Sequence, residues 1–218
     1  MGKEADIKTR LIQSIIQYVR QNHKDAIDKA YEYFWDVNYP DEFLNGTALE
    51  LGFINFEDWL VFDYKVNDDK ESFINLYVKN SGCLQEEELE VIAKIKDSVL
   101  GLYEVKSVSK DKRVLLGDLL GGGEFSLREK SLTRGLKKGD IFVTRLLNLD
   151  RQHVMSGCVY PFAAGQKKTI LEYVDKQFNR YRKNVDPEGT MEKYLKDYGD
   201  IFNIIWMNFI LKTRSKEA

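Results

Sequence analysis

The spacing of the apolar residues changes twice along the chain, and this constrains the fold more than any other feature. Over residues 1–98 apolar side chains recur at steps of three and four, which is the spacing of one face of an α-helix. Residues 99–163 instead hold short segments rich in β-branched and aromatic residues, separated by glycine and polar turns. Helical spacing returns over residues 164–218. The sequence therefore predicts an α+β chain with a helical subdomain, a small β domain and C-terminal helices that pack on the core.

Two helices of the first segment can be outlined from their residues. The first is predicted over residues 3–22, and its apolar stripe is Ile7, Leu11, Ile12, Ile15, Ile16 and Val19. A later one is predicted over residues 55–64, because Asn55 is a suitable N-cap and acidic residues follow it in the first turn. In the third segment Thr190 is predicted to cap one long helix.

The middle segment predicts a small antiparallel β-barrel of SH3-like or OB-like build. Its five expected strands cover residues 100–109, 113–120, 123–129, 140–149 and 153–162. The string Gly121–Phe125 resembles the GGDEF signature of diguanylate cyclases, but Gly123 stands where that family needs an acidic residue. A turn before the third strand is the better interpretation.

The sequence contains no recognisable catalytic motif. Its two histidines, His23 and His153, lie in no nucleophile motif, and a phosphate-binding G-x-x-x-x-G-K-[ST] loop is absent. Cys83 and Cys158 have neither disulfide-framework nor zinc-ligand spacing. We therefore expect no metal, no cofactor and reduced thiols. A charged N-terminus and a longest apolar run of 11 residues predict a cytoplasmic protein without a membrane span.

Charge is distributed unevenly along the chain. Residues 1–99 hold 11 basic and 20 acidic residues, whereas residues 100–163 hold 11 basic and 7 acidic ones. The basic set of the barrel is Lys106, Lys110, Lys112, Arg113, Arg128, Lys130, Arg134, Lys137, Lys138 and Arg145. It is interpreted as ordinary solvated surface, as a polyanion-binding patch, or as a surface on which the acidic helices dock. Nearby rings that could stack on bases are Tyr103, Phe125, Phe142 and Tyr160.

The segment from Tyr31 to Tyr77 is both aromatic and acidic, with 13 of the 27 aromatic residues, 11 acidic residues and two basic ones. Helical spacing of the rings favours core packing with a solvated acidic face. A contact site for a partner is the other interpretation, and its candidate residues are Glu57, Asp58, Trp59 and Asp63. Three of them, the carboxylates, could also form a catalytic site where helices and barrel meet.

Several short strings together resemble a known family. They are Phe56-x-x-Trp59-x-x-Phe62-Asp63-Tyr64, Ser98-x-x-x-Leu102-Tyr103-Glu104-Val105, Leu136-x-x-Gly139-Asp140 with Arg145-Leu146, and Ser156-Gly157. Over residues 50–165 the chain resembles an uncharacterised bacterial domain that often precedes a C-terminal SEC-C zinc-binding motif. The resemblance implies a bacterial cytosolic origin and no known activity. The final sequence LKTRSKEA has no cysteine or histidine, so the SEC-C zinc site is not expected here.

These observations predict a non-enzymatic binding or adaptor protein that acts through protein–protein contacts, including self-association. The first alternative is a barrel module that binds single-stranded nucleic acid. The second is an enzyme with a carboxylate site.

Overall fold

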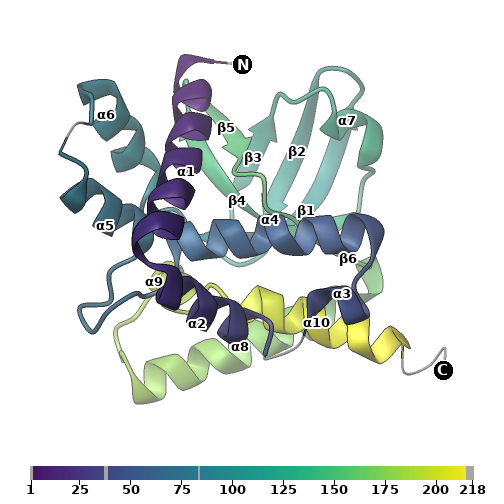
Figure 1. Ribbon diagram of the computed structural model, residues 1–218. Coiled ribbons are helices and arrows are strands. Elements are labelled where there is room, and N and C mark those ends of the chain that lie inside the picture. The colour runs from purple at the N-terminus through teal and green to yellow at the C-terminus, as the bar shows by residue number, and fades with distance from the viewer. Residues whose placement is uncertain (1, 37–38, 83, 215–218) are drawn as a thin grey trace. The chain divides into compact units, whose positions relative to one another are not determined.

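The computed structural model describes residues 2–36, 39–82 and 84–214 (Figure 1). Its contacts divide the chain into two compact units, which we name the helical unit (Met1–Ser98 with Leu147–Arg151) and the barrel unit (Val99–Leu146 with Gln152–Ala218). The predicted α+β fold with N-terminal helices, a small barrel and C-terminal helices is confirmed. The three-part division at residues 98 and 163 stays a prediction.

The helices of the helical unit are α1 (Lys3–Asn22), α2 (Lys24–Phe34), α3 (Pro40–Phe43), α4 (Gly46–Phe62), α5 (Phe73–Asn80) and α6 (Glu86–Ile95). Four residues of the apolar stripe expected on α1 are buried, namely Ile7, Leu11, Ile15 and Val19, whereas Ile12 and Ile16 are half-buried. Burial of this stripe stabilises α1, because helices in proteins draw most of their stability from packing.

Helix α4 begins nine residues earlier than the sequence predicts. Asn55 is therefore not an N-cap but a buried residue inside the helix, 1% exposed. The residues before it, from Gly46 to Ile54, continue the helix because they contain no proline and follow the capping position Asn45. This longer helix adds an exposed face that the shorter one would lack.

Aromatic rings form much of the core of the helical unit. Trp35 is 1% exposed and lies edge-to-face with Phe34, at 4.9 Å between ring centroids. Phe34 also contacts Phe56 at 5.3 Å and Trp59 at 5.1 Å. The cluster joins α2 to α4, as the helical spacing of these rings predicts.

The N-terminus of α1 is capped by a residue from far along the chain. The backbone N–H groups of Glu4 and Ala5 donate to the two carboxylate oxygens of Asp150, at 3.2 and 3.3 Å. In return the Asp150 N–H donates to the Glu4 carboxylate at 2.7 Å. Asp150 thereby satisfies N–H groups that have no partner within the helix, and its charge lies at the positive end of the helix dipole.

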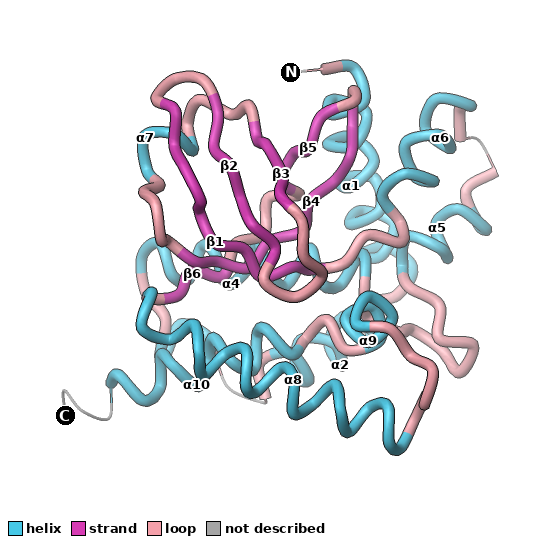
Figure 2. The backbone as a smooth tube through the Cα atoms, turned by 180° about the vertical axis from the view of Figure 1, so that it is seen from behind, coloured by secondary structure: helices cyan, strands magenta, loops and turns pink. Residues whose placement is uncertain are grey.

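The barrel unit is built on β1 (Leu100–Ser109), β2 (Arg113–Asp118), β3 (Glu124–Leu127), β4 (Ile141–Leu149), β5 (Gln152–Met155) and β6 (Tyr160–Phe162). Figure 2 shows β1, β2 and β3 side by side. The strand order β1-β2-β3-β5-β4 closes on itself because β4 also pairs with β1, and β6 extends the sheet on β4. The pairing of β3 with β5 is parallel, so the barrel is mixed rather than wholly antiparallel.

The last expected strand, over residues 153–162, divides into β5 and β6. Gly157 lies between them with a φ of +127°, in a region that side chains other than glycine rarely adopt. The Ser156 N–H donates to the Arg145 carbonyl at 2.9 Å and so anchors this bend to β4.

Apolar side chains fill the barrel, and the C-terminal helices pack against its added strand. The barrel core consists of Tyr103, Val105, Val114, Leu116, Leu127 and Phe142. The later helices are α7 (Leu132–Gly135), α8 (Lys167–Asn184), α9 (Met191–Asp197) and α10 (Ile201–Arg214). Aromatic rings connect β6 to α10, since the ring centroid of Tyr160 lies 5.7 Å from that of Trp206.

The single long helix expected from Thr190 is interrupted. Thr190 does cap α9, because its hydroxyl accepts from the Lys193 N–H at 3.1 Å. The helix then ends before Gly199, a residue that favours helix ends, and α10 begins afresh at Ile201.

Candidate partner-binding site

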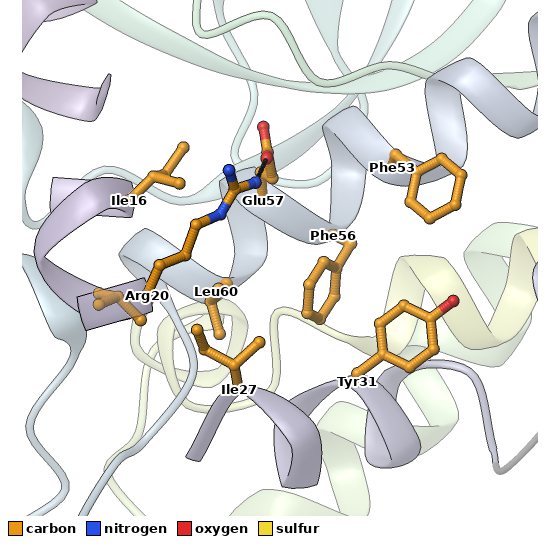
Figure 3. A pocket seen from close by; sticks show the side chains of 9 residues that line it. Ile16, Arg20, Ile27, Tyr31, Phe53, Phe56, Glu57 and Leu60 are labelled. Carbon is orange, nitrogen blue, oxygen red and sulfur yellow. Dashed lines mark hydrogen bonds and ion pairs between the residues drawn. The ribbon is translucent and has the colours of Figure 1, made fainter. Parts of the chain in front are cut away.

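An apolar cavity of about 210 Å³ lies in the helical unit (Figure 3). Three helices supply its lining, with Val19 from α1, Ile27 from α2, and Phe56 and Leu60 from α4. Val19, Phe56 and Leu60 are buried core residues, so the cavity reaches down to the core of the unit. This lining favours an apolar occupant. A polar occupant would lose its hydrogen bonds to water, and these four apolar side chains could not replace them.

The mouth of the cavity combines charge with aromatic rings. The Arg20 guanidinium forms an ion pair with the Glu57 carboxylate, at 3.1 Å between Nη2 and Oε1, and both side chains are substantially exposed (Figure 3). Phe53 is 42% exposed beside them. Tyr31 packs edge-to-face on Phe56 at 5.5 Å.

The exposed face of α4 continues this surface. Glu50, Phe53, Ile54 and Glu57 follow one another at steps of three, one and three, so they lie on the same side of the helix. Phe53 and Ile54 are both among the exposed large apolar residues of the chain. The helix thus presents two apolar side chains flanked by two carboxylates.

Of the four residues predicted as a contact site on this segment, Glu57 alone lines the cavity. Asp58, Trp59 and Asp63 are buried, at 9%, 4% and 3% exposure, so they do not reach the surface as expected. The reason is that α4 packs its Asp58–Phe62 turn into the core. Asp58 and Asp63 also do not line the cavity, and a catalytic site formed by the three carboxylates where helices and barrel meet stays a prediction.

Sequence reasoning missed Glu50, Phe53 and Ile54. Their i, i+3, i+4 spacing is the signal that identifies them, but a helix that begins at Asn55, as the sequence predicts, does not include these residues.

The predicted basic set of the barrel divides by burial. Lys110, Lys112, Arg113, Arg128, Lys130, Arg134, Lys137 and Lys138 are exposed, and Lys106 is half-buried and pairs with Glu104. Arg145 is 0% exposed, because it lies on β4 opposite Leu100 where the barrel closes. Arg145 therefore cannot belong to a surface patch, and the expectation for it is wrong.

The rings proposed for base stacking are also mostly inside. Tyr103, Phe142 and Tyr160 are buried, and Phe125 is half-buried with its ring edge-to-face with His153 at 5.0 Å. A stacking platform of several rings is therefore not available on the described surface of the barrel.

Cys158 is buried, and Cys83 lies outside the described residues. Across residues 2–36, 39–82 and 84–214, no three His, Cys, Asp or Glu side chains gather in a way that could hold a metal ion. In the same part of the chain no helix has the length and apolar character needed to cross a membrane.

A family model matches residues 6–196. The chain belongs to the family of unknown function DUF7986. The family is uncharacterised, as the resemblance implies, and the match includes every residue that lines the cavity as well as β1 to β6. No curated protein and no solved structure matches the chain.

Proposed function

We propose that this DUF7986 chain is a non-enzymatic binding protein, and that it holds a partner protein through the cavity lined by α1, α2 and α4. The observation that carries the proposal is an apolar cavity which opens beside an exposed helix face with two apolar side chains flanked by two carboxylates. Protein interfaces draw most of their affinity from a few anchor side chains that fill such pockets.

The size of the cavity favours a side chain over a free small molecule. At about 210 Å³ it falls below the range of roughly 300–1,000 Å³ that is typical of small-molecule sites. One large apolar side chain, such as phenylalanine or leucine, is an occupant of suitable size. The rest of the partner segment would then lie on Phe53 and Ile54.

Charge favours a basic segment. Residues 1–99 carry a formal excess of nine acidic residues, from 20 acidic and 11 basic ones. Glu50 and Glu57 flank the exposed apolar pair of α4. The proposed occupant is therefore a peptide segment of another protein in which one apolar anchor is followed or preceded by lysine or arginine.

The groups at the cavity favour binding over catalysis. Glu57 is paired with Arg20, and burial, followed by the charges of Asp41 and Tyr39, raises the pKa of Tyr31. Tyr31 therefore stays protonated near neutral pH and is a poor proton donor or acceptor there.

The proposal also includes where the protein acts and where it comes from. We propose a cytoplasmic location and a bacterial source in which related domains precede SEC-C motifs.

Selection from a displayed random peptide library on the purified full chain tests the proposal. We expect enriched peptides that share an apolar anchor next to a basic residue. Fluorescence anisotropy of a labelled peptide should show binding weakened at least about tenfold by Phe53→Asp, since a charge there opposes apolar contact. Leu89→Asp is the matched control, because Leu89 on α6 is 43% exposed and does not line the cavity.

Two results would contradict the proposal. One is a selection that yields no shared anchor-and-base pattern. The other is a peptide that binds the Phe53→Asp protein as tightly as the unchanged chain.

A further inference from the structure

Three segments of the barrel unit meet at one end of the barrel. They are the turn between β1 and β2, the residues that follow β3, and α7, which lies beside that turn in Figures 1 and 2. The Asp111 N–H in the turn donates to Thr133 Oγ1 on α7 at 2.9 Å. The pairing of Val114 with Leu127 brings the end of β3 against the beginning of β2. The sequence alone does not show this meeting.

Six exposed basic side chains gather there, and we name them the basic end: Lys110, Lys112, Arg113, Arg128, Lys130 and Arg134. The same segments carry two acidic residues, Asp111 and Glu129, so six basic and two acidic side chains give a formal charge of +4. Asp111 is already engaged by Arg134, at 3.0 Å between Oδ1 and Nη2. Among the residues that the structure describes, no ion pair engages the other five cations.

The arrangement places like charges close together. Arg113 begins β2 and Arg128 directly follows β3, so the two arginines adjoin the Val114–Leu127 pair. Like charges that lie close together repel each other, which destabilises the folded chain. A bound polyanion would remove this repulsion, which gives the cluster a physical reason to bind one.

We propose that the basic end binds double-stranded nucleic acid through its phosphate backbone, without reading the base sequence. Arginine and lysine side chains bind phosphates through their charge, and backbone contacts of this kind are independent of sequence. A duplex is favoured over a single strand because Tyr103, Phe142 and Tyr160 are buried and cannot stack on exposed bases.

A membrane surface fits this end less well. Stable attachment to a bilayer needs apolar side chains that enter the lipid as well as basic ones. The exposed large apolar residues of the described chain are Tyr33, Tyr39, Phe53, Ile54, Leu89, Val185, Tyr198, Ile204 and Leu211, and none of them belongs to the basic end.

Fluorescence anisotropy with labelled DNA and RNA duplexes of about 20 base pairs tests the inference on the full chain. If five cations each neutralise one phosphate, the logarithm of affinity should fall with that of salt concentration with a slope of about −4.5. Affinity would then fall roughly 500-fold between about 50 and 200 mM salt.

A triple variant locates the contact. Lys110→Gln, Lys112→Gln and Arg128→Gln together should reduce the slope to about −1.8, because two of the five contacts remain. The matched control is Lys176→Gln, Arg180→Gln and Lys183→Gln, which removes two lysines and one arginine from exposed positions of α8. Circular dichroism checks that both variants fold.

Several outcomes overturn the inference. They are no duplex binding at about 100 µM protein and 50 mM salt, an equal loss in both triple variants, or a slope that the first variant leaves unchanged. Binding to vesicles of phosphatidylserine and phosphatidylcholine without duplex binding would assign the surface to membranes instead. Because Phe53→Asp should leave duplex binding intact, failure of this inference is distinguishable from failure of the proposed partner site.

Discussion

The ring of Trp35 lies directly against the backbone of Gly52. A Cβ atom added at Gly52 would stand 2.8 Å from Cη2 of Trp35 and 3.1 Å from Cδ1 of Leu44. Glycine in the interior of α4 costs helix propensity, so its presence here reflects the close approach of α4 to the buried indole.

The first prediction concerns this contact. Gly52→Ala should lower the free energy of unfolding by about 1–2 kcal/mol, because the cost of overpacking exceeds the gain in helix propensity. Gly165→Ala is the control, since nothing lies within 4 Å of a Cβ at Gly165. Urea denaturation measures both. A Gly52→Ala protein at least as stable as the unchanged chain would show that the indole can move aside.

The second prediction concerns the burial of Arg145. Arg145→Ala should destabilise the chain by about 3–5 kcal/mol, because it removes a wholly buried charged side chain from the closing strand of the barrel. Arg113→Ala, an exposed arginine on β2, should change stability by no more than about 0.5 kcal/mol. Urea denaturation measures both variants, and equal losses of stability in Arg145→Ala and Arg113→Ala would contradict the prediction.

The third prediction is a pH dependence at Glu104. This carboxylate accepts from Lys106 and from Lys167, at 3.1 Å for Lys167 Nζ, and these bonds hold the pKa of Glu104 below its usual range. A lowered folded-state pKa gives stability that is present above the unfolded value of 4.5 and is lost as pH falls through the folded one.

Glu104→Gln should therefore cost about 1 kcal/mol at pH 7 and almost nothing well below pH 4. Urea denaturation across this range measures the difference. Glu172→Gln is the control, because its pair with Lys168 is exposed and 3.7 Å long. A stability difference for Glu104→Gln that did not shrink with acid would refute the role of the ionised carboxylate.

The fourth prediction is an alkaline transition at Tyr181. Its hydroxyl donates to Asp197 at 3.0 Å, and burial, then this bond and the charge of Asp197, raise the pKa of Tyr181 to about 12. The raised pKa adds stability that is complete below the unfolded value of 10 and is lost as pH rises through about 12. Tyr181→Phe should cost about 1 kcal/mol at pH 8, with a shallower loss above pH 10. Thermal unfolding and tyrosinate absorbance test it, and identical pH profiles would contradict it.

Much of the fold follows from residue spacing, because burial in a helix repeats with the helical period. The stripe of Ile7, Leu11, Ile15 and Val19 shows this directly. The start of α4 could not be predicted in the same way. Asn55 has the chemistry of an N-cap, but it lies inside α4 with its side chain buried against the core. The preference of asparagine for the N-cap position therefore does not decide where α4 begins.

The candidate sites show where sequence reasoning ends. Arg113 and Arg145 are both arginines on predicted strands, yet Arg113 is exposed and Arg145 is buried. Strand β4 is buried on both faces along residues 141–145, so the alternation that would mark a side chain as outward does not apply there. The closeness of the six basic side chains in the basic end likewise depends on strand register, which is set by pairing across the whole barrel.

The cap on α1 has a consequence for synthesis on the ribosome. Asp150 is 146 residues away from Glu4 in the chain, so α1 emerges long before the carboxylate that completes its first turn. At roughly 5–20 residues per second the wait is roughly 7–30 s. During this interval the N–H groups of Glu4 and Ala5 are without the carboxylate to which they donate in the folded chain. The N-terminal end of α1 is therefore completed only after most of the barrel has been translated.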